Sequence, residues 1–122
     1  MAEGVVFTER TYGTVKMIKA AWTAGTDGIV DADYTTTETY DGKIIFAATV
    51  PGTTTPTDQY DIELTDDDGV IDLAAKNLLN RSATTTEYVM DASLGAVAKS
   101  KINIAVSNAG NGGQGYLWLY IR

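Results

Sequence analysis

The C-terminal residues 102–121 constrain the fold more than any other stretch, because they combine two strand patterns with a turn between them. Apolar and small polar residues alternate over 102–107, which is the period of a half-buried β-strand. The next segment, 108–115, is built from Asn, Gly and Gln and favours a turn. Residues 116–121 are apolar throughout and mostly aromatic or β-branched. The pattern predicts a terminal β-hairpin.

The two faces of this hairpin are predicted to differ. One face should enter the core with six aliphatic side chains: Ile102, Ile104, Val106, Leu117, Leu119 and Ile121. The other face then carries an aromatic row of Tyr116, Trp118 and Tyr120. One small domain does not easily cover both faces of a terminal hairpin. The row is therefore either a second core layer or an interaction surface.

Strand patterns recur along the rest of the chain, with turn signals between them. They occupy residues 12–23, 43–50, 60–65 and 87–90. Within the third, Ile62 and Leu64 alternate with polar residues and should be core. Loops are expected at 24–42, 51–59 and 91–100. Residues 70–80 fit a short helix, or the preferred alternative of a short return strand followed by irregular structure.

These patterns predict an all-β protein with at most one short helix. The expected architecture is an antiparallel β-sandwich, jelly-roll or immunoglobulin-like, or a small barrel. At 122 residues the chain has the size of one domain, expected over residues 11–122. Residues 1–10, with Val5, Val6 and Phe7, form either a first strand or an N-terminal arm that docks on another chain. Lys16 and Lys19 in the strand over 12–23 suggest an edge guarded by charge.

The composition argues against most kinds of enzymatic catalysis. The chain has no Cys and no His, so thiol catalysis, disulfides and the commonest general base are excluded. No Ser-x-x-Lys spacing replaces them, and we predict that the protein is not an enzyme and carries no cofactor. Its net charge of −7 would repel a phosphate backbone, so nucleic acid is not an expected direct partner. No apolar run has the roughly eighteen residues of a membrane span, so no membrane partner is expected either.

Two acidic loops are candidates for metal binding. Carboxylates gather at Asp66, Asp67, Asp68 and Asp72, and again at Asp27, Asp31 and Asp33. Oxygen-rich loops suit Ca²⁺, yet the spacing lacks the pattern and the closing Glu of an EF-hand. Asp and Gly are also the usual residues of tight turns. We predict plain turns and no metal site.

The best candidate for binding is the aromatic row, joined by Trp22 and by the N-terminal apolar residues. Trp and Tyr dominate binding hot spots, which favours a protein–protein face or a carbohydrate face. An ordinary second core layer remains the alternative. The candidate interface residues are Val5, Val6, Phe7, Trp22, Tyr116, Trp118 and Tyr120.

Two stretches, 60–87 and 101–122, resemble a family of small, acidic, Cys-free bacteriophage virion proteins. The first matching features are a Tyr-Asp-x-x-Leu-Thr-Asp strand at Tyr60 to Asp66 and an Asp-Gly turn at Asp68-Gly69. They are followed by an Asn-Arg-Ser segment at Asn80 to Ser82 and a terminal Tyr-x-Arg at Tyr120 to Arg122. The resemblance covers about half of the chain and brings no active-site residues.

That resemblance implies a capsid cement or decoration protein, assembled in the host cytoplasm and located in the virion. Its expected partners are the major capsid protein or other virion subunits, together with copies of itself in a homo-oligomer. One alternative is a tail or head–tail connector component. Another, from a different class, is a carbohydrate- or receptor-binding β module.

Overall fold

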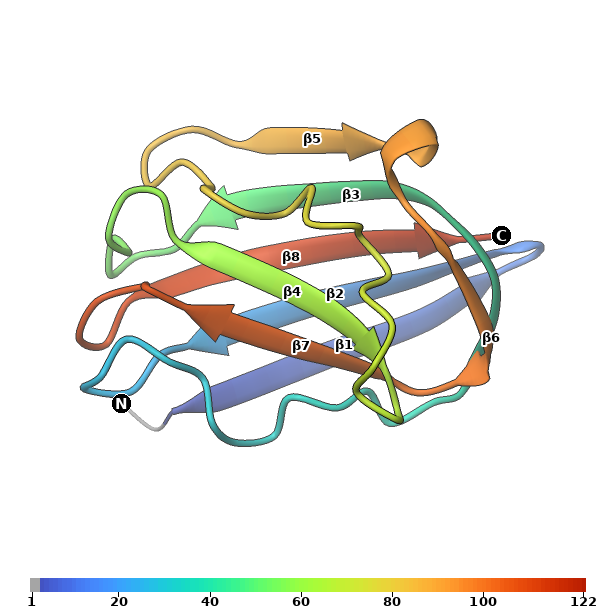
Figure 1. Cartoon of the computed structure of the whole chain (residues 1–122), viewed down its shortest axis with the longest axis horizontal. Coiled ribbons are helices and arrows are strands. Elements are labelled where there is room, and N and C mark those ends of the chain that lie inside the picture. The colour runs from blue at the N-terminus through green and yellow to red at the C-terminus, as the bar shows by residue number, and fades with distance from the viewer. Residues whose placement is uncertain (1–2) are drawn as a thin grey trace.

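Two antiparallel sheets pack face to face in the computed structural model, which describes residues 3–122 (Figure 1). The described residues form eight strands and one 3₁₀ turn, with no α-helix. The elements are β1 (Gly4–Tyr12), β2 (Val15–Thr23), β3 (Tyr40–Pro51), β4 (Asp61–Asp66), β5 (Glu87–Met90), η1 (Asp91–Ser93), β6 (Ala96–Ser100), β7 (Ile102–Ser107) and β8 (Gln114–Ile121). The expected all-β antiparallel sandwich is confirmed.

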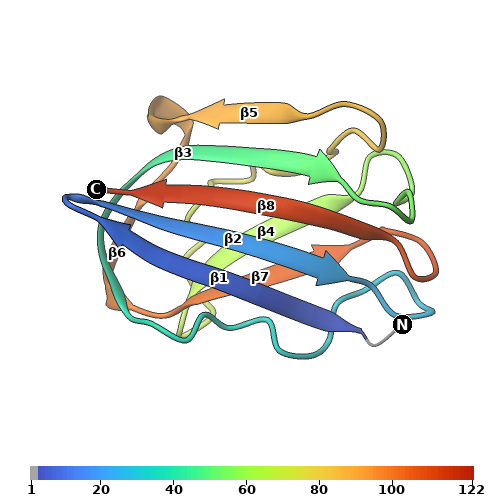
Figure 2. The same ribbon diagram turned by 180° about the vertical axis from the view of Figure 1, so that it is seen from behind.

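The larger sheet has six strands, five of which run in the order β1-β2-β8-β3-β5 (Figure 2). The last strand in sequence, β8, lies at its centre and pairs with β2 on one side and β3 on the other. The sixth strand, β6, pairs with the first residues of β3. β1 and β5 form the two edges, so β2 is an interior strand and the predicted charged edge at 12–23 is wrong.

The smaller sheet contains only β4 and β7, but irregular segments widen it on both sides. Beside β7, the N–H groups of Val30 and Thr36 donate to the carbonyls of Val106 and Ile102. Beside β4, residues 72–81 supply similar backbone hydrogen bonds, such as Leu73 N–H to Leu64 O at 2.7 Å. Residues 70–80 are therefore turns anchored to β4 and contain no helix. The preferred short return strand is also wrong, because a single bridge between Asp72 and Thr65 stands in its place.

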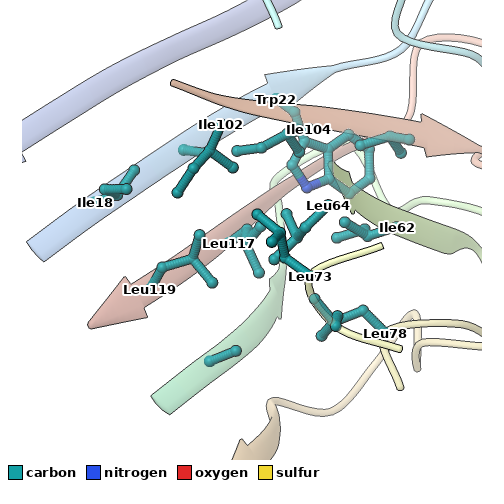
Figure 3. Close-up of a cluster of buried hydrophobic side chains, with 14 of the residues drawn as sticks. Ile18, Trp22, Ile62, Leu64, Leu73, Leu78, Ile102, Ile104, Leu117 and Leu119 are labelled. Carbon is teal, nitrogen blue, oxygen red and sulfur yellow. The ribbon is translucent and has the colours of Figure 1, made fainter. Parts of the chain in front are cut away.

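The core fills the space between the sheets (Figure 3). All eight side chains predicted to be core are at most 1% exposed: Ile62, Leu64, Ile102, Ile104, Val106, Leu117, Leu119 and Ile121. Leu73, Leu78 and Leu94 from the connecting segments complete it. Regular alternation in β4, β7 and β8 places one apolar row of each strand inside the sandwich.

The predicted terminal hairpin is wrong, although both of its strands exist. β7 pairs with β4 in the small sheet, whereas β8 belongs to the large sheet. The turn over 108–113 therefore crosses from one layer to the other. The alternation of apolar and polar residues along a strand predicts which side of the strand is buried, and both strands bury the predicted sides. This alternation does not predict which strand is the hydrogen-bonded neighbour.

The N-terminal segment is a strand, not an arm. Residues 4–10 belong to β1, and the first two residues of the proposed arm lie outside the described part of the chain. Nine consecutive residue pairs join β1 to β2 without a register shift. The loop expected over 91–100 contains η1 and the short strand β6, whose five residues gave no clear sequence pattern.

Candidate functional site

The outer side of the large sheet is rich in aromatic and aliphatic residues. No further layer covers this side among residues 3–122 (Figure 2). Paired residues of neighbouring antiparallel strands point to the same side, so the register identifies its members. We call this surface the outer aromatic face, and it comprises Val6, Thr8, Arg10, Tyr12, Val15, Met17, Lys19, Ala21, Phe46, Ala48, Val50, Tyr88, Met90, Tyr116, Trp118 and Tyr120.

β8 supplies the centre of the outer aromatic face. Its buried residues alternate with half-buried Tyr116, Trp118 and Tyr120, which point away from the core. Phe46 of β3 stacks on Tyr120 with ring centroids 5.1 Å apart and an interplanar angle of 22°. Tyr88 of the edge strand β5 lies 5.8 Å from Phe46. The predicted aromatic row is thus part of a wider aromatic cluster.

Lys19 lies among these rings and is not an isolated surface charge. Its Nζ is 5.1 Å from the ring centroid of Tyr116 and 5.2 Å from that of Trp118, within range of cation–π attraction. Together with Arg10, it is one of two charged residues that the register places on the outer aromatic face. Both charges are positive, in a chain whose net charge is −7.

Large apolar groups remain exposed at the two edges of this face. Val6 is 72% and Tyr12 is 60% exposed on β1, while Tyr88 is 61% and Met90 is 57% exposed on β5. Between β5 and β8 the surface forms a shallow groove, lined by Phe46, Ala48, Val50, Thr86, Tyr88, Trp118 and Tyr120. Exposed apolar groups gathered on one face in this way are typical of sites that another molecule covers.

The opposite side of the molecule has a different character. Outward residues of β4 and β7 are small or polar: Asp61, Glu63, Thr65, Asn103, Ala105 and Ser107. Several are held by side-chain hydrogen bonds, such as Asn108 Nδ2 to Asp61 Oδ2 at 2.6 Å and Thr35 Oγ1 to Asn103 Oδ1 at 2.6 Å. One side of the sandwich is therefore aromatic and basic, and the other is polar and acidic.

The candidate interface residues fall into two groups. Val6, Tyr116, Trp118 and Tyr120 meet on the outer aromatic face. Val5 and Trp22 are core residues, 7% and 1% exposed, and Phe7 packs against the core from the inner side of β1. The assignment of Trp22 to the binding surface is wrong because Trp22 shares the inward alternation of Ile18 and Ala20. The assignment of Val5 and Phe7 is wrong for the same reason, since they pair with Trp22 and Ala20.

Sequence reasoning missed most members of the surface, among them the large side chains of Tyr12, Phe46, Tyr88 and Met90. Tyr88 and Met90 flank buried Val89, so the alternation in β5 could have identified them. Phe46 follows a register shift between Ile44 and Phe46 that breaks the alternation of β3. No local signal in the sequence marks such an irregularity.

The acidic residues over 66–72 act as turn residues. The carbonyl of Asp66 accepts the Gly69 N–H at 2.9 Å, and its side chain accepts the Val70 N–H at 3.3 Å. Asp72 accepts the N–H groups of Ala74 and Lys76 with its two carboxylate oxygens. Within residues 3–122, no group of three or more acidic side chains is arranged to hold a metal ion.

One carboxylate is held more tightly than the others. Glu9 of β1 accepts the N–H groups of Thr37 and Glu38, each at 3.0 Å, and the hydroxyl of Tyr40 at 2.7 Å. Burial raises the pKa of Glu9, but these hydrogen bonds outweigh burial and hold its pKa below the ordinary value of 4.5. Burial and the bond to Glu9 raise the pKa of Tyr40 far above its ordinary value. The contact fastens the loop over 36–39 to β1.

No helix in the described part of the chain has the length and apolar character needed to cross a bilayer. No family model matches the chain, and no curated protein matches it. Among solved structures the chain is similar to a cupin domain from Bordetella pertussis Tohama I, with 12% identity and a TM-score of 0.37. The alignment covers 100% of this chain and 97% of that one. A similarity at this level carries no argument about function.

Proposed function

We propose that the protein is a non-enzymatic structural component of a bacteriophage virion, most specifically a capsid cement or decoration protein. The observation that carries the proposal is the outer aromatic face, an uncovered apolar surface on an otherwise polar, acidic domain. The resemblance of residues 60–87 and 101–122 to virion proteins supports the same role. In this role the face binds the major capsid protein or another virion subunit.

The size of the outer aromatic face fits the centre of such a contact. Its strands lie about 4.8 Å apart, and its members extend over seven residues on each of β1 and β2, five on each of β8 and β3, and three on β5. At about 3.3 Å per residue these lengths give an area of roughly 400 Å². A stable protein–protein interface buries about 800 Å² on each partner. The face therefore supplies about half of one partner's share of such a contact.

The charges suggest what the partner surface looks like. Arg10 and Lys19 favour a partner that is apolar at its centre and carries carboxylates around it. Trp118 lies at the middle of the face, between Lys19 of β2 and Ala48 of β3. Central, well-packed Trp residues contribute most to binding energy. Trp118 is therefore the residue on which we expect the contact to depend most.

The test is incorporation into particles. Virions assembled with Trp118→Asp protein should carry much less of it than wild-type virions, measured by mass spectrometry of purified particles, and should release their genome at a lower temperature. Ala105→Asp is the matched control because Ala105 is exposed on the opposite side. Melting curves must show that both variants fold. The proposal fails if virions lack the wild-type protein, or if Trp118→Asp is incorporated as well as the control.

A carbohydrate-binding module is the second candidate, favoured by the aromatic groove between β5 and β8. The packing of its rings argues against it. Phe46 and Tyr120 stack on each other, so each ring uses a face that a sugar would need. A glycan array separates the two functions: strong, Trp118-dependent binding to one glycan class would favour the carbohydrate module.

A further inference from the structure

The free edge of the large sheet at β1 has the properties of a strand that pairs with another strand. β1 is nine residues long, and its pairing with β2 runs without a bulge from Gly4↔Thr23 to Tyr12↔Val15. Its backbone forms no hydrogen bond to any loop or turn among residues 3–122. In an antiparallel pair, alternate residues direct both their N–H and C=O groups away from the neighbour. A row of free donors and acceptors therefore lines this edge.

Proteins usually protect such an edge with proline, a bulge, a short strand or a charge. β1 has no proline and no register shift, whereas the opposite edge strand β5 has only four residues. β1 carries two charges, Glu9 and Arg10. The Glu9 carboxylate turns inward to Thr37, Glu38 and Tyr40, and Arg10 belongs to the outer aromatic face. The same contacts fix the strand in place, which lowers the entropic cost of binding a partner.

We propose that two copies of this chain pair antiparallel through β1, with Thr8 at the two-fold axis. This register overlaps all nine residues of the strand, because Gly4 then lies opposite Tyr12 and Val5 opposite Thr11. It also sets Arg10 opposite Val6 and Glu9 opposite Phe7, so no like charges face each other directly. Shifting the axis to Glu9 sets two carboxylates against each other and shortens the overlap.

The pairing joins two large sheets into one and brings both outer aromatic faces to the same side. Each subunit then presents that face to a partner next to its copy, and linked contacts of this kind gain avidity without new interactions. The dimer forms in the free protein, so its presence or absence is independent of the proposed virion role. An edge contact is smaller than the roughly 1,200 Å² of a stable interface, and we expect a dimer that forms reversibly as concentration rises.

Single cysteines test the register directly, because the natural chain contains none. In the proposed dimer the two copies of residue 8 face each other with Cα atoms about 4.5–5.5 Å apart, within the range of a disulfide. Thr8→Cys should therefore form a disulfide-linked dimer rapidly under mild oxidation. Val6→Cys is the control on the same strand and side. Its two copies lie four residues apart along the ladder, about 13 Å, which is too far.

The control is strict because Val6 is 72% exposed, so random collisions would crosslink Val6→Cys at least as fast as Thr8→Cys. The proposal predicts at least tenfold faster crosslinking at residue 8, measured by non-reducing gel electrophoresis over time. Equal rates at the two positions, or no dimer of Thr8→Cys at high concentration, would overturn it.

Charge at position 6 provides a second, independent measurement. In the dimer Val6 lies opposite Arg10, so Val6→Lys places like charges opposite each other twice, whereas Val6→Glu places opposite charges there. Sedimentation equilibrium should show at least a tenfold weaker dimer for Val6→Lys than for Val6→Glu. Adding Arg10→Glu to Val6→Lys should restore association. If Trp118→Asp abolishes the dimer while Val6→Lys leaves it intact, the copies associate through the outer aromatic face and the edge pairing is wrong.

Discussion

At the scale of single residues, Gly115 explains how the largest core side chain is accommodated. Gly115 of β8 lies opposite Trp22 of β2, on the inner side of the sheet. A Cβ atom at position 115 would collide with the indole ring of Trp22. The ring also packs on Tyr60, with centroids 5.1 Å apart, so it has little room to move. A small residue on β8 and a large one on β2 are therefore matched across the ladder.

Gly115→Ala should accordingly destabilise the protein by about 1–3 kcal/mol, the usual cost of overpacking a core. Urea denaturation of the variant measures this loss. In a double-mutant cycle with Trp22→Phe, the two changes should cost less together than the sum of their separate effects, because the smaller ring relieves the collision. Additive costs would show that the strain at residue 115 does not come from Trp22.

The Glu9 carboxylate gives stability a defined dependence on pH. Its pKa is lowered in the folded protein from an ordinary value of 4.5, so the folded state favours the ionised form. The contribution to stability is therefore complete above the unfolded pKa and disappears as the pH falls through the lower, folded pKa. Glu9→Gln should reduce the free energy of unfolding at pH 7, and the difference from wild type should vanish in strong acid.

Denaturation at a series of pH values measures this difference. Tyr40→Phe, which removes one of the three hydrogen-bond donors, should show a smaller effect in the same direction. A difference between wild type and Glu9→Gln that stays constant from pH 7 to strong acid would contradict the role assigned to the carboxylate.

At the scale of elements, the sequence predicted the strands and their buried sides better than their partners. Ile102 and Leu119 are inside as expected, yet their strands face each other across the core instead of pairing. A short turn between two alternating strands usually indicates a hairpin. Here Ala109 and Gly113 are buried, and Gly113 accepts a hydrogen bond from Ala24, so tertiary contacts direct the turn across the layers.

The candidate surface could be predicted only in part for a similar reason. Tyr116, Trp118 and Tyr120 follow from the alternation of one strand, but their neighbours Phe46 and Tyr88 come from distant segments. Bringing them together requires the strand order of the large sheet. That order depends on pairings far apart in sequence, which local patterns do not encode.

The strand order predicts unequal local stability. β8 is paired on both sides, whereas β5 is a four-residue edge strand. Amides of interior strands exchange only when large parts of a protein open, whereas edges open locally. Hydrogen exchange followed by mass spectrometry should therefore show the slowest exchange in peptides covering residues 114–121 and much faster exchange over 87–90. Similar protection of the two segments would contradict the strand order.

At the scale of the whole molecule, the two sides of the sandwich differ in both polarity and charge. Stability comes from the core between the sheets, in which the largest side chains are fully buried. The carboxylates of Asp66 and Asp72 are occupied by backbone N–H groups. Nothing in this arrangement calls for a cation to hold the fold together.

Chelation should therefore leave the melting temperature unchanged. A bound cation would stabilise the folded state by mass action, so its removal by EDTA would lower the melting temperature. Differential scanning calorimetry with and without EDTA, and with added Ca²⁺, measures the effect. A shift of several degrees would change the role of the acidic turn from backbone capping to metal binding.

The central position of β8 also determines when the large sheet can form. β2 and β3 are not hydrogen-bonded to each other, and only β8 joins them. Until β8 arrives, both strands expose an unpaired side, and the pairing that closes the sheet joins segments near the two ends of the sequence. Such loops close slowly, and an open slot accepts the same strand from a neighbouring molecule. We therefore expect refolding at high protein concentration to yield strand-exchanged oligomers, and refolding at low concentration to yield the closed sandwich.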